Sequence, residues 1–176
     1  EYFIKQKSDR HQFRPATQVV LFEMLRNDRN ARMAELAIRL GYSAMTISRA
    51  FDELQSAGIA ESRVAGRERH ISLAGESRAV WQKARPYLID PVQNRHWVTI
   101  GGRRKLPGPY AGLSALSRYS MLAEPDYSVI ALSRSQWRQV QQHDAPVEAI
   151  AGEPDALQIE VWVYPPSLFA AADLVD

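Results

Sequence analysis

The side chains best suited to chemistry in this sequence are arginines gathered around one glycine. Arg63, Arg67 and Arg69 lie within seven residues of one another, and Gly66 stands between the first and the second. A guanidinium is always charged and donates paired hydrogen bonds, so such a cluster suits phosphate groups. Gly66 allows the positive φ that a tight turn needs. Strand-like runs on both sides of this turn predict a basic β-hairpin over residues 59–73.

Catalytic side chains do not form a comparable pattern. The four histidines are spread along the chain without metal-ligand spacing, and there is no cysteine to form a disulfide, a zinc site or a thiol nucleophile. Two carboxylate pairs, Glu124-Pro125-Asp126 and Glu153-Pro154-Asp155, have the spacing of a nucleotidyltransferase, but a central proline fits a turn better than a strand. The sequence therefore predicts no enzyme, no catalytic residue, no metal and no cofactor.

The residues before the hairpin predict two helices joined by a tight turn. The apolar pattern of residues 31–40 is helical, with Asn30 as its expected N-cap. Gly41 permits the left-handed turn that ends this helix, and Ser43 can cap the next one over residues 44–57. The buried face of that second helix is expected to consist of Ile47, Phe51 and Leu54. Helix, turn, helix and hairpin in this order form a winged helix-turn-helix.

This arrangement predicts duplex DNA as the partner. The face of the second helix opposite its buried stripe enters the major groove in such folds. Arg49 can bind guanine through two hydrogen bonds, Ala44 and Met45 can contact a thymine methyl, and Ser43 and Thr46 lie near phosphates. Arg32, near the start of the preceding helix, is expected to meet the DNA backbone. The full set of expected DNA contacts is Arg32, Ser43, Ala44, Met45, Thr46, Ser48, Arg49, Arg63, Arg67 and Arg69.

Charge and composition divide the chain near residue 91. Residues 1–90 hold 15 Lys/Arg and 11 Asp/Glu, a net charge of +4. Residues 91–176 hold 7 Lys/Arg and 9 Asp/Glu, a net charge of −2, and the two parts sum to the total of +2. We expect an arm at 1–15, the winged helix at 16–90 and a domain for partner binding or sensing at 91–176.

No apolar run reaches ~18 residues and the start is not a signal peptide, so a cytoplasmic protein without a membrane partner is expected. The chain lacks an initiator Met and stops abruptly, which predicts a fragment at both ends.

The second half predicts a mixture of helices and strands, so the expected fold class is α+β. Expected strands are 97–100, 127–132, 147–151 and 157–164, and expected helices are 110–122 and 134–142. A basic patch of Arg103, Arg104 and Lys105 is expected to face nucleic acid or a partner, with a solvated loop as the alternative.

Residues 16–86 resemble the MarR-like winged-helix regulators. The resemblance rests on residues 33–37 (MAELA), 46–54 (TISRAFDEL) with 57–59 (AGI), and 66–73 (GRERHISL). It implies the same recognition helix and wing arginine, and a repressor of transcription. Members are typically dimers held by helices at both chain ends, and many bind phenolic ligands. The α/β second half departs from that pattern, so neither property is carried over.

The second half resembles the C-terminal part of AbiEi-type antitoxins, bacterial regulators with an N-terminal winged helix. The resemblance rests on the short stretches 111–117 (AGLSALS) and 119–122 (YSML). It implies a type IV toxin–antitoxin system, in which the antitoxin represses its own promoter and counters a nucleotidyltransferase-like toxin as its partner. Regulators of this type commonly bind palindromes as dimers, so a homodimer is also expected. A winged helix that docks protein, or a DNA-tethered nucleotidyltransferase-like enzyme, remain the alternatives.

Overall fold

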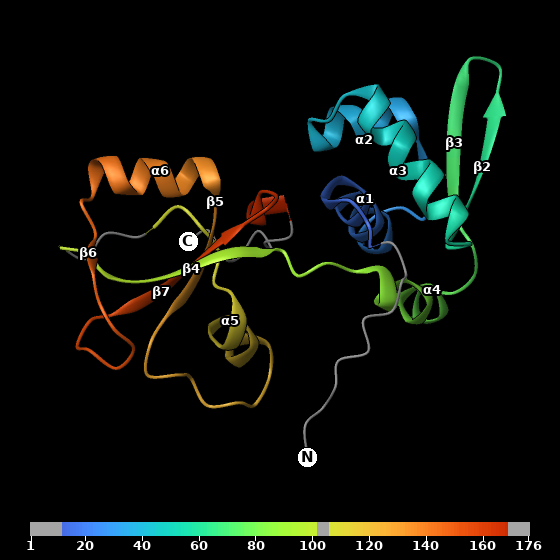
Figure 1. Cartoon of the computed structure of the whole chain (residues 1–176). Helices are drawn as coiled ribbons and strands as arrows, with labels where there is room; N and C mark the ends of the chain where they lie inside the picture. Colours follow the sequence, from blue (N-terminus) through green and yellow to red (C-terminus); the bar gives the residue numbers. More distant parts are fainter. Residues whose placement is uncertain (1–11, 102–105, 169–176) are drawn as a thin grey trace. The chain divides into compact units, whose positions relative to one another are not determined.

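The computed structural model describes residues 12–101 and 106–168, which form two compact units divided between Ile89 and Asp90 (Figure 1). The fold is α+β, with a winged helix followed by an α/β domain. The division lies one residue before the boundary expected from composition. No helix among the described residues is long and apolar enough to cross a membrane.

The winged-helix unit contains one three-stranded antiparallel sheet and four helices. The sheet has the order β1-β3-β2. In chain order the elements are α1 (Pro15–Arg26), β1 (Asn30–Arg32), α2 (Met33–Leu40), α3 (Ala44–Ser56), β2 (Ala60–Ala65), β3 (Glu68–Leu73), α4 (Ser77–Ala84) and the short 3₁₀ helix η1 (Arg85–Tyr87).

The start of α2 differs from the expected one. Residues 30–32 were expected to begin the helix, with Asn30 as the cap, but they form β1 and pair with β3. The helix begins two residues later, at Met33, and the side chain of its N-cap residue, Arg32, makes no capping hydrogen bond. Pairing with β3 places Ala31 opposite Ile71 and buries it to 8% exposure, and the Asn30 backbone N–H donates to the Asp28 carboxylate at 2.9 Å.

The core of the winged-helix unit forms where α3 packs against α1. The three apolar residues predicted for α3, Ile47, Phe51 and Leu54, are all fully buried. Phe13 is also buried, stacks on Tyr87 with ring centroids 5.2 Å apart, and donates its backbone N–H to the Tyr87 carbonyl at 2.8 Å. The segment just before α1 therefore belongs to this packing, whereas residues 1–11 of the expected arm lie outside the described residues.

The second unit contains a four-stranded sheet with the order β5-β7-β4-β6. Its elements are β4 (Val92–Thr99), α5 (Gly112–Tyr119), β5 (Val129–Ser133), α6 (Arg134–His143), β6 (Val147–Glu148), β7 (Leu157–Trp162) and the short 3₁₀ helix η2 (Pro166–Leu168). Only the β5–β7 pair is parallel among these strands. Helices α5 and α6 cover opposite faces of the sheet (Figure 1), because Val129 and Ala131 pack in one apolar cluster and Leu132 packs with Trp137 in another.

Candidate nucleic-acid interface

The turn between α2 and α3 is fixed by two residues that the sequence identifies. Gly41 ends α2 at φ +67°, the left-handed conformation that glycine adopts without strain. Ser43 caps α3, because its hydroxyl accepts the Thr46 backbone N–H at 3.2 Å and lies 2.9 Å from the Thr46 hydroxyl. Between them, burial raises the pKa of the Tyr42 phenol above its ordinary value.

The most exposed side chains in the N-terminal half of α3 have no partner among the described residues, apart from the cap bonds of Ser43. Ser43, Ala44, Met45 and Arg49 are exposed, and Met45 retains 64% of its accessible surface. Within the described part of the chain, the Arg49 guanidinium has no carboxylate or hydrogen-bond partner. Because Ile47 and Phe51 fix the buried side, Met45 and Arg49 must lie on the opposite side of the helix. This half of α3 is therefore available to a ligand as the sequence predicts.

The C-terminal half of α3 is bonded to the start of α1. The Glu53 carboxylate accepts the Thr17 hydroxyl at 2.6 Å and the Arg14 backbone N–H at 3.1 Å. The same carboxylate pairs with the Arg14 guanidinium at 3.0 Å. These contacts fix the orientation of α3 about its axis, which in turn fixes the direction of Arg49.

The wing consists of β2, β3 and the two-residue turn between them. Ala65 and Glu68 are the last paired residues, so the turn is Gly66-Arg67. Gly66 has φ +65°, and glycine at the first position of a two-residue turn is typical of the type II′ hairpin. Arg67 is exposed at the tip, and the structure records no ion pair for it among the described residues.

The three wing arginines do not share one face of the sheet. Residues paired directly across antiparallel strands point to the same side. Arg63 pairs with His70, which pairs with Arg32, so these three form a row on the outer face. Arg69 and Ile71 are two residues apart on β3, so their side chains point to the same face of the sheet. Ile71 is 1% exposed, so this is the inner face, toward α3.

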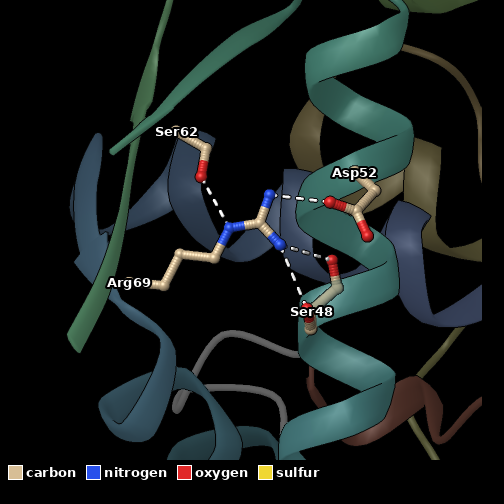
Figure 2. A network of polar contacts seen from close by, with 4 residues as sticks. All are labelled: Ser48, Asp52, Ser62 and Arg69. Atoms are coloured by element: carbon tan, nitrogen blue, oxygen red, sulfur yellow. Dashed lines mark hydrogen bonds and ion pairs between the residues drawn. The ribbon is translucent and has the colours of Figure 1, made fainter. Parts of the chain in front are cut away.

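Arg69 uses its guanidinium to bridge the wing and α3 (Figure 2). Its Nε donates to the Ser62 hydroxyl at 2.7 Å, on the neighbouring strand. Its Nη1 donates to the Ser48 hydroxyl at 3.0 Å and to the Ser48 carbonyl at 3.3 Å. Its Nη2 donates to the Asp52 carboxylate at 2.7 Å, and the guanidinium carbon lies 5.6 Å from the centre of the Phe51 ring. Only 20% of the side chain is exposed, so its donors point into the protein.

The expected contact residues thus fall into three groups. The first is outward and unpaired in the described chain, and comprises Ala44, Met45, Arg49, Arg63 and Arg67. The second consists of Ser43 and Thr46, which bond to each other at the helix start. The third is bonded within the protein, and comprises Ser48, Arg69 and Arg32, whose guanidinium lies 3.6 Å from Glu35 and 3.8 Å from Glu68.

The sequence reasoning missed the partners of Arg69. Neither Ser62 nor Asp52 belongs to the set of DNA contacts expected from the sequence. The alternation of side chains along β3 indicates that Arg69 faces inward, because it lies on the same face as the apolar Ile71 and Leu73. An arginine on that face must meet polar atoms or lie over an apolar ring, and here it does both.

The acidic and histidine side chains of the second half do not gather into a metal-binding group in its described part. No group of three or more His, Asp or Glu that could hold a metal occurs among residues 12–101 and 106–168. Glu153 and Asp155 lie in the turn before β7, and both are exposed. Arg103, Arg104 and Lys105, the expected second basic patch, lie outside the described residues.

Comparisons with known proteins give little further information. No protein-family model matches the chain, and no curated protein matches it. Among solved structures, it is similar to the AntR antimony-specific transcriptional repressor, with 19% sequence identity and a TM-score of 0.28. The similarity covers 49% of this chain and 89% of that chain. A similarity at this level does not assign a function, which must rest on the geometry of α3 and the wing.

Proposed function

We propose that the winged-helix unit binds duplex DNA, with the start of α3 in the major groove and the wing against the adjacent minor groove or its phosphates. The observation that carries this proposal is the N-terminal half of α3. The exposed side chains of Ala44, Met45 and Arg49 bond to no other described residue, so no bond would have to break, and a basic hairpin is bonded directly to the same helix. Positive charge at both places supplies the salt-dependent attraction to phosphates that DNA binding needs.

Each side chain then has a distinct role. Arg49 reads a guanine, and Ala44 and Met45 contact a thymine methyl. Arg63 and Arg67 bind phosphates or the minor groove, and Ser43 and Thr46 at the helix start bind phosphates. Arg32 contacts the DNA backbone. Arg69 and Ser48 hold the wing in position against α3, which revises the direct contact first expected of them.

Selection from a randomised duplex library, followed by affinity measurements on the selected site, tests this proposal. Arg49→Ala should lose about 1–3 kcal/mol of discrimination between the selected site and a site with one base pair changed. Arg67→Ala should weaken binding to every sequence alike and lower the salt slope by about one. Arg78→Ala, which removes an exposed charge from α4, serves as the matched control. Binding that is equal in all three variants and insensitive to salt would remove the DNA assignment.

Regulation of transcription, most simply repression, is the function we propose for this binding, and catalysis is not part of it. An exposed apolar stripe on α5 of the second unit supports this proposal over a bare DNA-binding module. Leu113, Leu116 and Tyr119 recur at spacings of three along α5, and each is at least 47% exposed. An apolar stripe of this kind is typical of a surface that another protein covers.

An autoregulating antitoxin of a type IV system is the more specific form of this proposal. It is supported by the sequence resemblance at residues 111–122, which include α5. On this view, α5 contacts the toxin. The winged helix binds a palindrome as a homodimer and represses the shared promoter. A neighbouring gene for a nucleotidyltransferase-like protein, whose toxicity this chain relieves, is the expected finding. A neighbour of unrelated chemistry would leave a regulator without the antitoxin role.

A further inference from the structure

A cleft in the second unit lies where the parallel strands β5 and β7 end. Ser133 and Trp162, the last residues of these strands, are paired across the sheet, and both line the cleft. Its volume is about 490 Å³, within the range of roughly 300–1,000 Å³ usual for small-molecule sites. Ligands of open α/β sheets commonly bind outside the carboxyl ends of parallel strands. The position and size of this cleft are therefore those of a ligand site.

Two arginines without carboxylate partners line this cleft. Arg134 and Arg138 are four residues apart on α6, so they project from the same side of the helix. Arg134 donates to the Gln93 side-chain oxygen at 3.1 Å, and neither arginine forms an ion pair with any residue that the structure describes. Two like charges at this spacing repel each other unless an anion lies between them.

The other described cations of this unit are already occupied. Arg95 pairs with the nearly buried Glu160 carboxylate at 3.2 Å, and the Arg118 guanidinium lies 3.9 Å from the centre of the Tyr110 ring. The two unpaired arginines therefore coincide with the cleft, in a half of the chain whose net charge is −2. Both arginines are exposed, and an anion site accounts for their meeting in the same cleft.

The aromatic wall of the cleft is held rigidly. The Trp162 indole N–H donates to the Glu160 carboxylate at 3.1 Å, and the ring meets Tyr164 edge-on at 6.0 Å between centroids. Trp162 is half-buried and Tyr164 is buried, so the contact with Tyr164 holds the exposed part of the Trp162 ring in place. A planar or apolar group can pack on such a surface while an attached anionic group bonds to the arginines.

From this arrangement we propose that the cleft binds a small phosphorylated molecule, whose phosphoryl oxygens bond to Arg134 and Arg138 and whose planar part packs against Trp162. Guanidinium forks match phosphoryl oxygens through paired hydrogen bonds. The site belongs to the second unit alone and does not depend on DNA binding by the first.

Isothermal titration of the intact chain with ADP, pyrophosphate and adenosine at constant ionic strength, without DNA, tests this proposal. We expect saturable binding of ADP, weaker binding of pyrophosphate and no binding of adenosine. Arg134→Gln combined with Arg138→Gln should weaken ADP at least about tenfold, because both charged hydrogen-bond donors are lost. Arg118→Gln, which removes one positive charge outside the cleft, should leave the affinity for ADP unchanged, also when each measurement is repeated at a second ionic strength. No saturable binding of either phosphorylated probe, or equal ADP binding by the double variant, would overturn the site.

Discussion

The two halves of α3 differ in what their polar side chains contact. In the C-terminal half, Asp52 bonds to Arg69 of the wing and Glu53 bonds to the start of α1. In the N-terminal half, Met45 and Arg49 face outward and bond to nothing else in the described chain. The same helix thus serves as a structural anchor at one end and as an open surface at the other.

This difference shows that the number of arginines near a wing does not give the number available to DNA. The Arg69 guanidinium donates to three side chains and a carbonyl, and it would have to lose those bonds to reach a phosphate. An unpaired guanidinium such as that of Arg49 loses only water. Substitutions of the bonded side chains should therefore weaken the fold, whereas substitutions of the unbonded ones should weaken DNA binding.

The largest effect is expected at the buried side of α3. Phe51→Ala should lower the free energy of unfolding by about 3–5 kcal/mol, because Phe51 is fully buried and its removal leaves a cavity. Met45→Ala, on the exposed side of the same helix, should stay within about 0.5 kcal/mol. Denaturant unfolding of both variants measures this contrast, and a similar loss in the two would show that the helix faces are wrongly assigned.

The next effect concerns the anchor of α3 on α1. Glu53→Ala should cost about 1–3 kcal/mol, because the Thr17 hydroxyl is only 1% exposed and loses its acceptor. Glu53→Gln keeps an acceptor oxygen and should cost less. The same unfolding measurement compares the two variants, and an equally stable Glu53→Ala protein would mean that this anchor contributes nothing to the fold.

A smaller effect separates the two faces of the wing. Arg69→Met should cost about 1–2 kcal/mol, because two serine hydroxyls lose a charged donor while the exposed Asp52 contributes little. Arg63→Met, on the outer face, should be neutral within about 0.5 kcal/mol but should weaken DNA binding. Thermal unfolding and duplex affinity measured on both variants test this, and the opposite order of stabilities would contradict the assignment of faces.

The smallest effect is expected at the exposed end of the bridge. Asp52 is 61% exposed, so Asp52→Asn should cost about 0.2–1 kcal/mol, and salt should reduce that cost. Unfolding in low and in high salt measures the difference between the variant and the native chain. A loss that persists undiminished at high salt would show that the carboxylate acts through its hydrogen bond and not through its charge.

Periodicity predicted most of the winged helix. The spacing of Ile47, Phe51 and Leu54 identified the buried face of α3, and Gly41 and Gly66 have the positive φ that their turns require. Ser43 is the N-cap that its position predicted. These features depend on residues close together in the sequence, so local physical rules are enough to find them.

Features that depend on distant residues were not predicted. Asn30–Arg32 is a strand because β3, about forty residues later, offers a free edge to pair with. Arg69 turns inward because Ser48, Asp52 and Ser62 meet on that side of the wing. Neither tertiary contact appears in a local pattern, although the alternation of β3 already placed Arg69 beside buried residues.

The most direct test of the central claim is an amide NMR titration of the labelled chain with its selected duplex. If α3 and the wing bind the duplex, the largest shifts should occur at residues 43–49 and 63–67, with small shifts in the second unit. Shifts that are confined to residues 90–176, while the start of α3 and the wing tip remain unchanged, would contradict that claim.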